Sequence, residues 1–498
     1  MDFVTTSFAG VGIAAGAIAP DISRVDARPV ESRFETYQGW STRSFEAGET
    51  TRLNQAHWHN AQDRDINLWL SERLSTIRAR AIYERRNNPL LAGMSRSLAD
   101  DVVGCDGPIL TIQSDDETYN AALAEAWRLW FRAPTFSQNV SGVAWLKMCV
   151  GNLPSCGEFL ATIGTDNRAD GPVKMRLWPR APRLLIHPEG DFYPYRLMGI
   201  ERNEHLQPTR YWFRRHEGLS AEIDPYSPDD VIHEFMADEE GQVRGYPWLT
   251  SALQPAADLR DFDDQTLDAA RQEADNMGLL YTDHQDAPVW ATPESTDVER
   301  RTIKMAPPGW KPFQYMATTP PVQYPAYRLE RHRELGRPFN MPAFMVRLDS
   351  SGHNYSSVRM DMQSYGGFVS GVQMWLSGSP DSVGLLNRLL DLVAAEARFE
   401  VPALRNRPAR VTYEWTWPKR PHVDPMKEAQ GLAADLASGC EDGISALAAR
   451  GQTIERHIAN QKRFVAAYEK ADLEPPAYAA PEPVPDQTAD QQEVAANG

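Results

Sequence analysis

A long helical stretch in the middle of the chain constrains the fold more than any other segment. From about Trp248 to Met277, apolar residues recur at three- and four-residue spacing and give the helix a single apolar stripe, made of Leu249, Leu253, Ala256, Leu259, Leu267, Ala270 and Ala274. At 1.5 Å per residue, such a helix would be about 45 Å long. Pro- and Gly-rich sequence follows at 287–325, and a shorter helix is predicted over Ala326–Gly336.

The remaining periodicity predicts an α+β fold that is mainly helical. Helices are expected over 62–86, from Leu90 to Val102, around Trp127, from near Ser356 onward and over 426–470. Between 105 and 240, Pro and Gly turns separate short β-like runs, namely Ile109–Ile112, Phe159–Ile163, Met175–Trp178, Leu184–Ile186 and Tyr211–Arg214. With 498 residues, the chain is long enough for two or three domains.

The charge balance of the chain limits which classes of binding partner are expected. The chain has 68 acidic and 51 basic side chains, a formal net charge of −17. This balance argues against tight, general binding of nucleic acid, but it is compatible with DNA that slides past without sticking. Phe8–Ala19 is apolar but too short to cross a bilayer, which takes about 20 residues, so no membrane association is expected.

The sequence lacks the motifs of the common enzyme classes. It contains no phosphate-binding loop, no zinc-protease helix, no nucleophile elbow and no dinucleotide fingerprint. We therefore expect no catalytic residue and no cofactor. Trp415 and Trp417 alternate as on a strand, which is more typical of a core than of a sugar platform. The cysteines are spaced as reduced, mostly buried thiols rather than metal ligands: Cys105, Cys149, Cys156 and Cys440.

Two patterns resemble metal sites, and neither is expected to be one. His57 and His59 can share one face of a strand, but a lone pair at this spacing is seldom a site. Asp261, Asp263 and Asp264 lie in mid-helix among other acids, which is typical of a solvated helix face.

Four strings, in this order, resemble portal proteins of lambda-type tailed bacteriophages. They are Arg85–Pro89 with Asp100–Gly104, His233–Phe235 with Arg244–Leu249, Asn354–Arg359, and Val423–Ala429. Each string alone is weak, but their order and spacing cover residues from about 60 to 470.

The resemblance implies a portal fold with a wing, a two-helix stem, a clip and a C-terminal helical crown. Mapped onto this sequence, the expected parts are a wing (61–245), a first stem helix (246–278), a clip (279–324), a second stem helix (325–347), a tunnel loop (348–355), wing helices and a strand (356–425) and a crown (426–470). Composition adds a flexible N-terminal arm (1–60) and a disordered acidic tail (471–498).

The resemblance also implies a function and partners. A portal is a ring of about twelve subunits around a channel at one capsid vertex. Double-stranded DNA passes through the channel without sequence specificity. The implied protein partners are the terminase large subunit, a head-completion (adaptor) protein, and the major capsid and scaffold proteins. The implied location is the virion, after assembly in the host cytoplasm, and no ATP hydrolysis by the portal itself is implied.

Two sets of candidate site residues follow. The tunnel loop, expected to touch DNA, comprises Asp349, Ser350, Ser351, Gly352, His353 and Asn354. The contact between neighbouring stems is expected to use an acidic first helix and a basic second one, through Asp261, Asp264, Asp268, Arg328, Arg331 and Arg333. The same charges would also be found if the two helices had unrelated, solvent-exposed faces that contact no neighbour, and that alternative stays open.

Two other functions compete with this one. A hydrolase acting on a polymer would use paired carboxylates and Trp platforms, for which composition is the only support. Another virion component, such as a tail or baseplate protein, would usually be rich in β repeats, whereas this chain reads as mostly helical.

Overall fold

The computed structural model describes the chain in segments: residues 56, 61–137, 139–188, 195–215, 222–275, 279–281, 311–313, 323–352, 354–378, 383–418, 425–450 and 452–470. The chain divides after Asp63, and the unit that starts at Arg64 holds every element below. Nearly all of the expected arm, most of the expected clip, the pair His57 and His59, His353 and the acidic tail lie outside the described residues.

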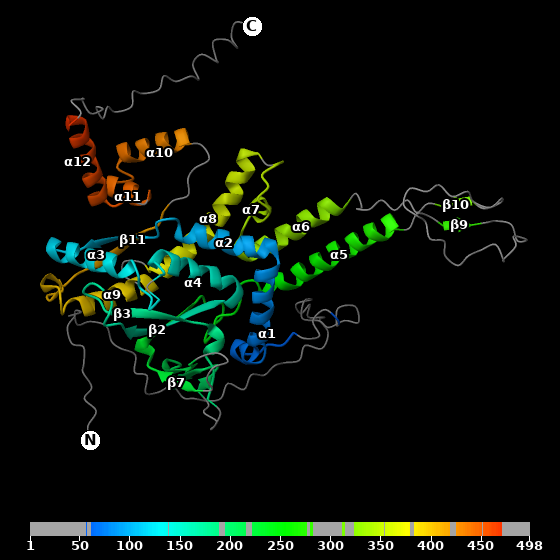
Figure 1. Cartoon of the computed structure of the whole chain (residues 1–498), viewed down its shortest axis with the longest axis horizontal. Helices are drawn as coiled ribbons and strands as arrows, with labels where there is room; N and C mark the ends of the chain where they lie inside the picture. Colours follow the sequence, from blue (N-terminus) through cyan, green and yellow to red (C-terminus); the bar gives the residue numbers. More distant parts are fainter. Residues whose placement is uncertain are drawn as a thin grey trace, which may run out of the picture. The chain divides into compact units, whose positions relative to one another are not determined.

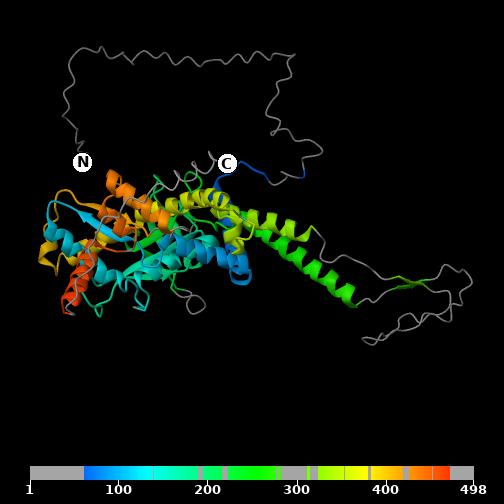
Figure 2. The same cartoon turned by 90° about the horizontal axis from the view of Figure 1, so that it is seen from above.

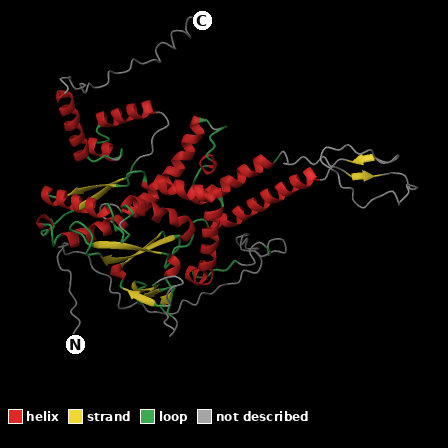
Figure 3. Cartoon of the chain, in the orientation of Figure 1, coloured by secondary structure: helices red, strands yellow, loops and turns green. Residues whose placement is uncertain are grey.

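Helices dominate the described residues (Figure 3). They are α1 (Ile66–Asn87), α2 (Pro89–Val103), α3 (Glu117–Phe131), α4 (Gly142–Cys156), α5 (Leu253–Asp275), α6 (Tyr324–Gly336), α7 (Ala343–Arg347), α8 (Tyr355–Ser377), α9 (Leu385–Ala397), α10 (Pro425–Ser438), α11 (Gly443–Ala448) and α12 (Ile454–Lys470). Side-chain caps explain several boundaries: Asn88 accepts hydrogen bonds from the first turn of α2, and Asp116 does so for α3.

The described strands form four small antiparallel sheets. The strands are β1 (Ile109–Gln113), β2 (Glu158–Thr165), β3 (Met175–Arg180), β4 (Arg196–Leu197), β5 (Ile200–Arg202), β6 (Pro208–Arg214), β7 (Ile223–Tyr226), β8 (Val231–Phe235), β9 (Leu279–Tyr281), β10 (Lys311–Phe313) and β11 (Thr412–Thr416). The sheet orders are β1-β11, β9-β10, β3-β2-β8 and β4-β5-β6-β7. The fold is therefore α+β and mainly helical, as predicted.

The central strand β2 separates two apolar cores because its side chains alternate between faces. Phe159 and Ala161 face the main core, which α2, α3, α4, α8 and α9 enclose. Leu160, one residue along, packs instead with Tyr211 and Phe213 of the four-stranded sheet. Glu158, the first residue of β2 (the strand is labelled in Figure 1), shares its face with Leu160, so the fold places a carboxylate at the edge of this second core.

Two glycines allow the backbone to cross just before β2. Gly157 has φ +76°, and a Cβ there would lie 1.9 Å from the carbonyl oxygen of Tyr246. A Cβ on Gly245 would lie 2.2 Å from the carbonyl oxygen of Gly157. Only glycine fits at both positions. Their close approach brings Glu158 beside Arg244.

The long helix α5 is anchored in the core at one end and then continues beside α6 (Figure 2). Ala256 and Leu259 are buried, whereas Leu267, two turns further on, is half exposed. The helix starts at Leu253, later than the expected 246, because Pro247 favours a turn and the short 3₁₀ turn Thr250–Ala252 intervenes. Pro255 lies in its first turn, where proline is tolerated.

The expected second stem helix over 325–347 is interrupted. α6 ends at Gly336, a 3₁₀ turn follows, Asn340 takes φ +51°, and α7 begins only at Ala343. The chain folds back so closely that a Cβ on Gly336 would lie 2.3 Å from the carbonyl oxygen of Met341. Pro338 and Pro342 prevent a continuous helix across this break.

Among the other local predictions, most of the strands are confirmed, and the burial of the cysteines is only partly confirmed. Four of the five expected strands are present as β1, β2, β3 and β6. The run Leu184–Ile186 is not a strand, because Pro182 starts a 3₁₀ turn there and only Leu185 makes an isolated bridge, to Phe213. All four cysteines are free, but only Cys149 and Cys156 are buried.

Candidate functional site

The loop between α7 and α8 is held at its start by local polar contacts. Leu348 closes α7 with φ +53° and leaves its side chain 88% exposed. Arg347 forms an ion pair with Asp349 at 3.1 Å. The backbone N–H and the hydroxyl of Ser351 donate to Oδ1 of Asp349, at 3.0 Å and 2.5 Å. The first half of the loop is therefore a small, nearly neutral turn.

The far end of the loop is held by a helix cap. Asn354 accepts a hydrogen bond from the N–H of Ser357 at 2.9 Å and so starts α8. Gly352 between them has φ +80°, and nothing lies within 4 Å of where its Cβ would be. Ser350, Ser351 and Gly352 are exposed. The loop is thus fixed at both ends with a polar, unobstructed tip.

The helix that follows the loop, α8, is anchored to α2. The hydroxyl of Tyr365 on α8 donates to Asp101 at 2.6 Å, and Gln373 donates to the carbonyl of Val102 at 2.8 Å. A shallow hollow at the base of the loop is lined by Asp100 and Asp101 of α2 and by Phe344 and Met345 of α7. Displacing the loop would therefore not require α8 to move.

The α5–α6 contact joins an aspartate to a tyrosine and an arginine. Asp263 accepts a hydrogen bond from the Tyr324 hydroxyl at 2.8 Å and pairs with Arg328 at 3.3 Å. The ring centroids of Phe262 and Tyr327 lie 4.7 Å apart beside them. Asp263 is therefore not on a solvated face, which corrects that expectation for one of the three clustered acids.

The other predicted stem residues are exposed or paired within their own helix. Arg331 pairs with Glu334, and Arg333 with Glu330, each three residues away on α6. On α5, Asp268 pairs with Arg271 at 3.1 Å, while Asp261 and Asp264 make no ion pair with any described residue. The three predicted arginines thus already have partners in one chain, and two of the three predicted aspartates do not.

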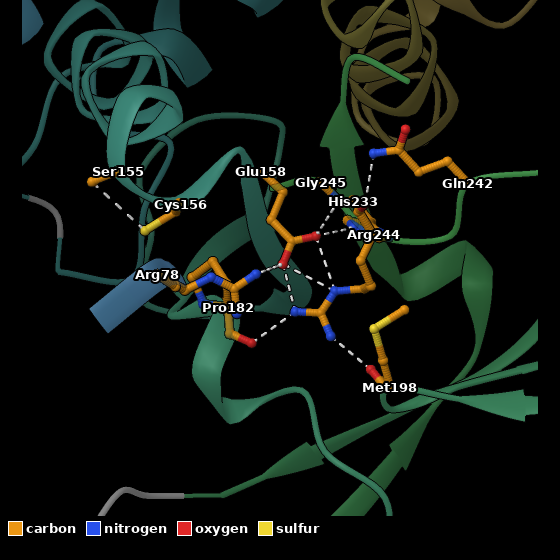
Figure 4. A network of polar contacts seen from close by, with 10 residues as sticks. All are labelled: Arg78, Ser155, Cys156, Glu158, Pro182, Met198, His233, Gln242, Arg244 and Gly245. Carbon is orange, nitrogen blue, oxygen red and sulfur yellow. Dashed lines mark hydrogen bonds and ion pairs between the residues drawn. The ribbon is translucent and has the colours of Figure 1, made fainter. Parts of the chain in front are cut away.

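A buried ionic cluster, not predicted from the sequence, surrounds Glu158 (Figure 4). Its carboxylate accepts from Arg78 of α1 at 2.8 Å, from Nε and Nη2 of Arg244 at 2.5–3.0 Å, and from the N–H of Gly245 at 3.0 Å. Arg244 also donates to the carbonyls of Met198 and Pro182. The cluster ties α1, the three-stranded sheet and the four-stranded sheet together.

The protonation states in this cluster follow from burial and charge. Burial alone would raise the pKa of Glu158, but Arg244 and His233 outweigh it and hold the pKa below its usual range. Burial lowers the pKa of His233, so its ring is neutral at neutral pH. Because an ionised carboxylate only accepts, Nε2 of His233 carries the proton in its 3.0 Å bond to Glu158. The cluster is structural, since every oxygen of Glu158 is occupied.

Glu234, next to His233 on β8, should make stability depend on pH. Burial raises its pKa to about 7, opposed by Arg388. A raised carboxyl pKa favours folding at low pH, and this contribution is lost as pH rises from about 4.5 to about 7. We expect Glu234→Gln to flatten the melting-temperature profile over that interval and to be the more stable protein at pH 8. A wild-type profile that Glu234→Gln leaves unchanged would contradict the assignment.

The described part of the chain offers neither a membrane span nor a metal site. None of its helices combines the length and apolar character needed to cross a bilayer. Within the same residues, no three His, Cys, Asp or Glu side chains gather as metal ligands would.

Comparison with known proteins identifies relatives at the level of family. The family model described as "Phage portal protein, lambda family" matches residues 51–373. No curated protein sequence matches the chain.

Solved structures resemble the chain only distantly. The neck of a native gene transfer agent particle, computed with C12 symmetry, is 12% identical, with a TM-score of 0.45 over 74% of this chain and 91% of that one. A portal protein of the HK97 family from Corynebacterium diphtheriae is 11% identical, with a TM-score of 0.31 over 70% of this chain and 96% of that one.

Proposed function

The chain belongs to the lambda family of phage portal proteins, and from that premise we propose that it closes into a ring of about twelve copies around a DNA channel. A portal protein is a structural component of the virion and connects the head to the tail. The family match, which covers most of the described helices and strands, is the observation that carries this proposal.

The α7–α8 loop is the proposed contact with passing DNA. Its serine hydroxyls and the side chain of Asn354 can make short-lived hydrogen bonds to phosphate oxygens. Asp349 offsets Arg347, so the described part of the loop carries no excess positive charge. A strongly basic loop would hold DNA through counterion release and oppose its movement. The near-neutral, polar tip therefore supports a sliding contact.

The stem helices are the proposed contact between neighbours. In this proposal Asp261, Asp264 and Asp268 of α5 face the next subunit, because they lie on the exposed side of the helix. Arg328 acts within the chain, where it pairs with Asp263 and joins α5 to α6. Arg331 and Arg333 form exposed pairs on α6, each worth at most about 1 kcal/mol.

The remaining partners follow the family. We propose that the clip region binds the terminase large subunit during packaging and a head-completion protein afterwards. The wing would contact capsid and scaffold proteins during assembly in the host cytoplasm. We also propose that the protein has no catalytic activity of its own. Trp415 cannot form the sugar-binding platform of the competing hydrolase, because it is buried, stacks edge-on against Trp127 and donates its N–H to Asn387.

The test of this function is assembly. We expect mass photometry of the purified full-length protein to show a discrete species of about twelve copies. Negative-stain micrographs should show rings with a central hole. Only monomers and dimers, over a range of protein and salt concentrations, would overturn the proposal.

A further inference from the structure

A basic hollow lies on the surface formed by α1, α2 and α4. Arg85 and Arg86 of α1, Arg96 of α2 and Lys147 of α4 line this hollow of about 670 Å³. Asp100 is the single acid in its lining. Such a concentration of positive charge is unexpected in a chain whose net charge is −17.

Two of the four cations are available to a ligand. Arg85 donates to the carbonyl of Gly151 at 2.5 Å, and Lys147 pairs with Asp100 at 2.6 Å. Arg86 and Arg96 are exposed and make no ion pair with any residue that the structure describes. Guanidinium groups bind carboxylates in a planar, two-bond geometry, so the hollow suits an acidic protein surface.

An acidic stripe of matching character lies on α5. Asp261, Asp264 and Asp268 are spaced three and four residues apart and fall within a sector of about 60° around the helix. All three are exposed. Asp263 points the other way, toward α6, where it pairs with Arg328. The stripe is therefore an exposed, negatively charged face of a long helix, on which Asp261 and Asp264 make no ion pair with any described residue and Asp268 pairs with Arg271.

The stripe and the hollow of one chain face different ways. Glu84 of α1 pairs with Arg260 of the same chain's α5 at 2.6 Å, which fixes the side of α1 that α5 contacts. Arg86 follows two residues later and lies about 200° further around α1. Because α5 of the same chain is held on the opposite side, its acidic stripe cannot fill the hollow.

We propose that the acidic stripe of α5 binds in the basic hollow of a second copy of the chain. One subunit then offers the stripe and its neighbour the hollow, which is a head-to-tail contact of the kind that closes into a ring. This inference rests on the proposed ring and adds the residues that set its register. Charge complementarity identifies the second copy as the occupant, and binding of DNA phosphates in the hollow is the competing outcome of the test.

Charge reversal tests the contact in the full-length protein. We expect Arg86→Glu with Arg96→Glu, or Asp261→Lys with Asp264→Lys, to raise the protein concentration needed for half-assembly by about tenfold or more. Combining all four substitutions should restore assembly, because each pair regains an opposite charge. Arg132→Glu with Arg168→Glu, at exposed positions directly after α3 and after β2, is the matched control and should assemble like the wild type.

Cross-linking gives a readout that does not depend on the strength of the contact. With the exposed Cys105 and Cys440 changed to Ser, Arg96→Cys and Asp264→Cys should react with a short bis-maleimide to give a ladder of covalent oligomers. Arg168→Cys with Asp264→Cys should give none.

The outcomes separate this inference from the proposed function. Wild-type protein that forms no rings would overturn the proposed function. Rings that form normally in both charge-reversal variants would overturn the inference but not the proposed function. The inference would also be overturned if the combined fourfold variant failed to restore assembly and the cysteine variants gave no cross-linked ladder. Reversals at Arg86 and Arg96 that spare the ring but release packaged DNA would assign the hollow to phosphate instead.

Discussion

Glu158→Gln is expected to destabilise the protein by about 3–5 kcal/mol, because it removes one charge from a buried ionic cluster. Glu158 has no exposed surface and is bonded to Arg78, Arg244 and His233. Glutamine keeps the size of the side chain but leaves two buried guanidinium groups without a counter-charge. It also presents an N–H₂ group where donors already point.

Guanidinium unfolding at one fixed protein concentration, followed by Trp fluorescence, measures this effect. Glu125→Gln is the matched control, since Glu125 forms two hydrogen bonds to Arg128 at 2.6 and 2.7 Å but on an exposed helix surface. That control should change stability by less than about 1 kcal/mol. If the two variants lost the same stability, the cluster would not join α1 to the two sheets as described.

Local elements with a single apolar stripe could be predicted from the sequence. α1 and α2 each combine three- and four-residue spacing with a clear stop signal, such as Asn88 before Pro89, and α5 shows the spacing. Their boundaries shift by a few residues where proline or a 3₁₀ turn intervenes. The helices predicted on either side of the Pro- and Gly-rich segment are also present, as α5 and α6.

Two core helices were not located from their periodicity, for different reasons, although α9 lies in the segment 356–425 where wing helices were expected. α4 buries Trp145, Leu146, Cys149, Val150 and Leu153 at helical spacing, but apolar residues such as the exposed Met148 also lie outside that face, and Pro154 lies inside the helix, so the pattern is less clear in the sequence. α9 does have a signal, since Leu386, Leu389, Leu390 and Val393 recur at helical spacing and are buried. The spacing of these four residues is therefore sufficient to predict α9 from the sequence.

The cluster around Glu158 could not be predicted in the same way. Its members are separated by about eighty residues, and each pairing depends on how β2, α1 and the Arg244 segment cross. In the sequence, Glu158 is a charged residue between Gly157 and an apolar strand. That pattern by itself fits the end of any strand. Only the close approach of Gly157 and Gly245 makes that carboxylate buried.

Charge composition cannot show which charges of the stem helices are paired within one chain. The excess of arginine on α6 indicated a surface for a neighbour, but Arg328, Arg331 and Arg333 are all paired within the chain. Sequence counts cannot separate paired from unpaired charges. Arg86 on α1 and Arg96 on α2, by contrast, line one hollow and make no ion pair with any described residue.

Deleting Ser350–His353 is expected to leave rings intact and to weaken retention of packaged DNA by about fivefold per subunit contact. The hydroxyl of Ser350 can donate a hydrogen bond worth about 1 kcal/mol, and 1.4 kcal/mol corresponds to a factor of ten, whereas Ser351 would have to exchange its bond to Asp349 for one to DNA. The ends of the loop keep their own anchors, because Asp349 donates its N–H to the carbonyl of Phe344 and Asn354 caps α8. Neither α5 nor α6 contributes to these anchors, so assembly should be unaffected.

Point variants that keep the length of the loop show whether the change in side chains or the change in backbone geometry causes the effect on DNA retention. Ser350→Ala with Ser351→Ala should weaken retention in the same direction, whereas Ser350→Lys with Ser351→Lys should slow DNA release and make it depend on salt. Nuclease protection of DNA in assembled particles measures retention, and mass photometry checks the ring in parallel. The loop would instead be assigned to assembly if the deletion abolished the ring while both point variants retained and released DNA normally. Contacts to sliding DNA cannot be lost without changing how well the DNA is retained.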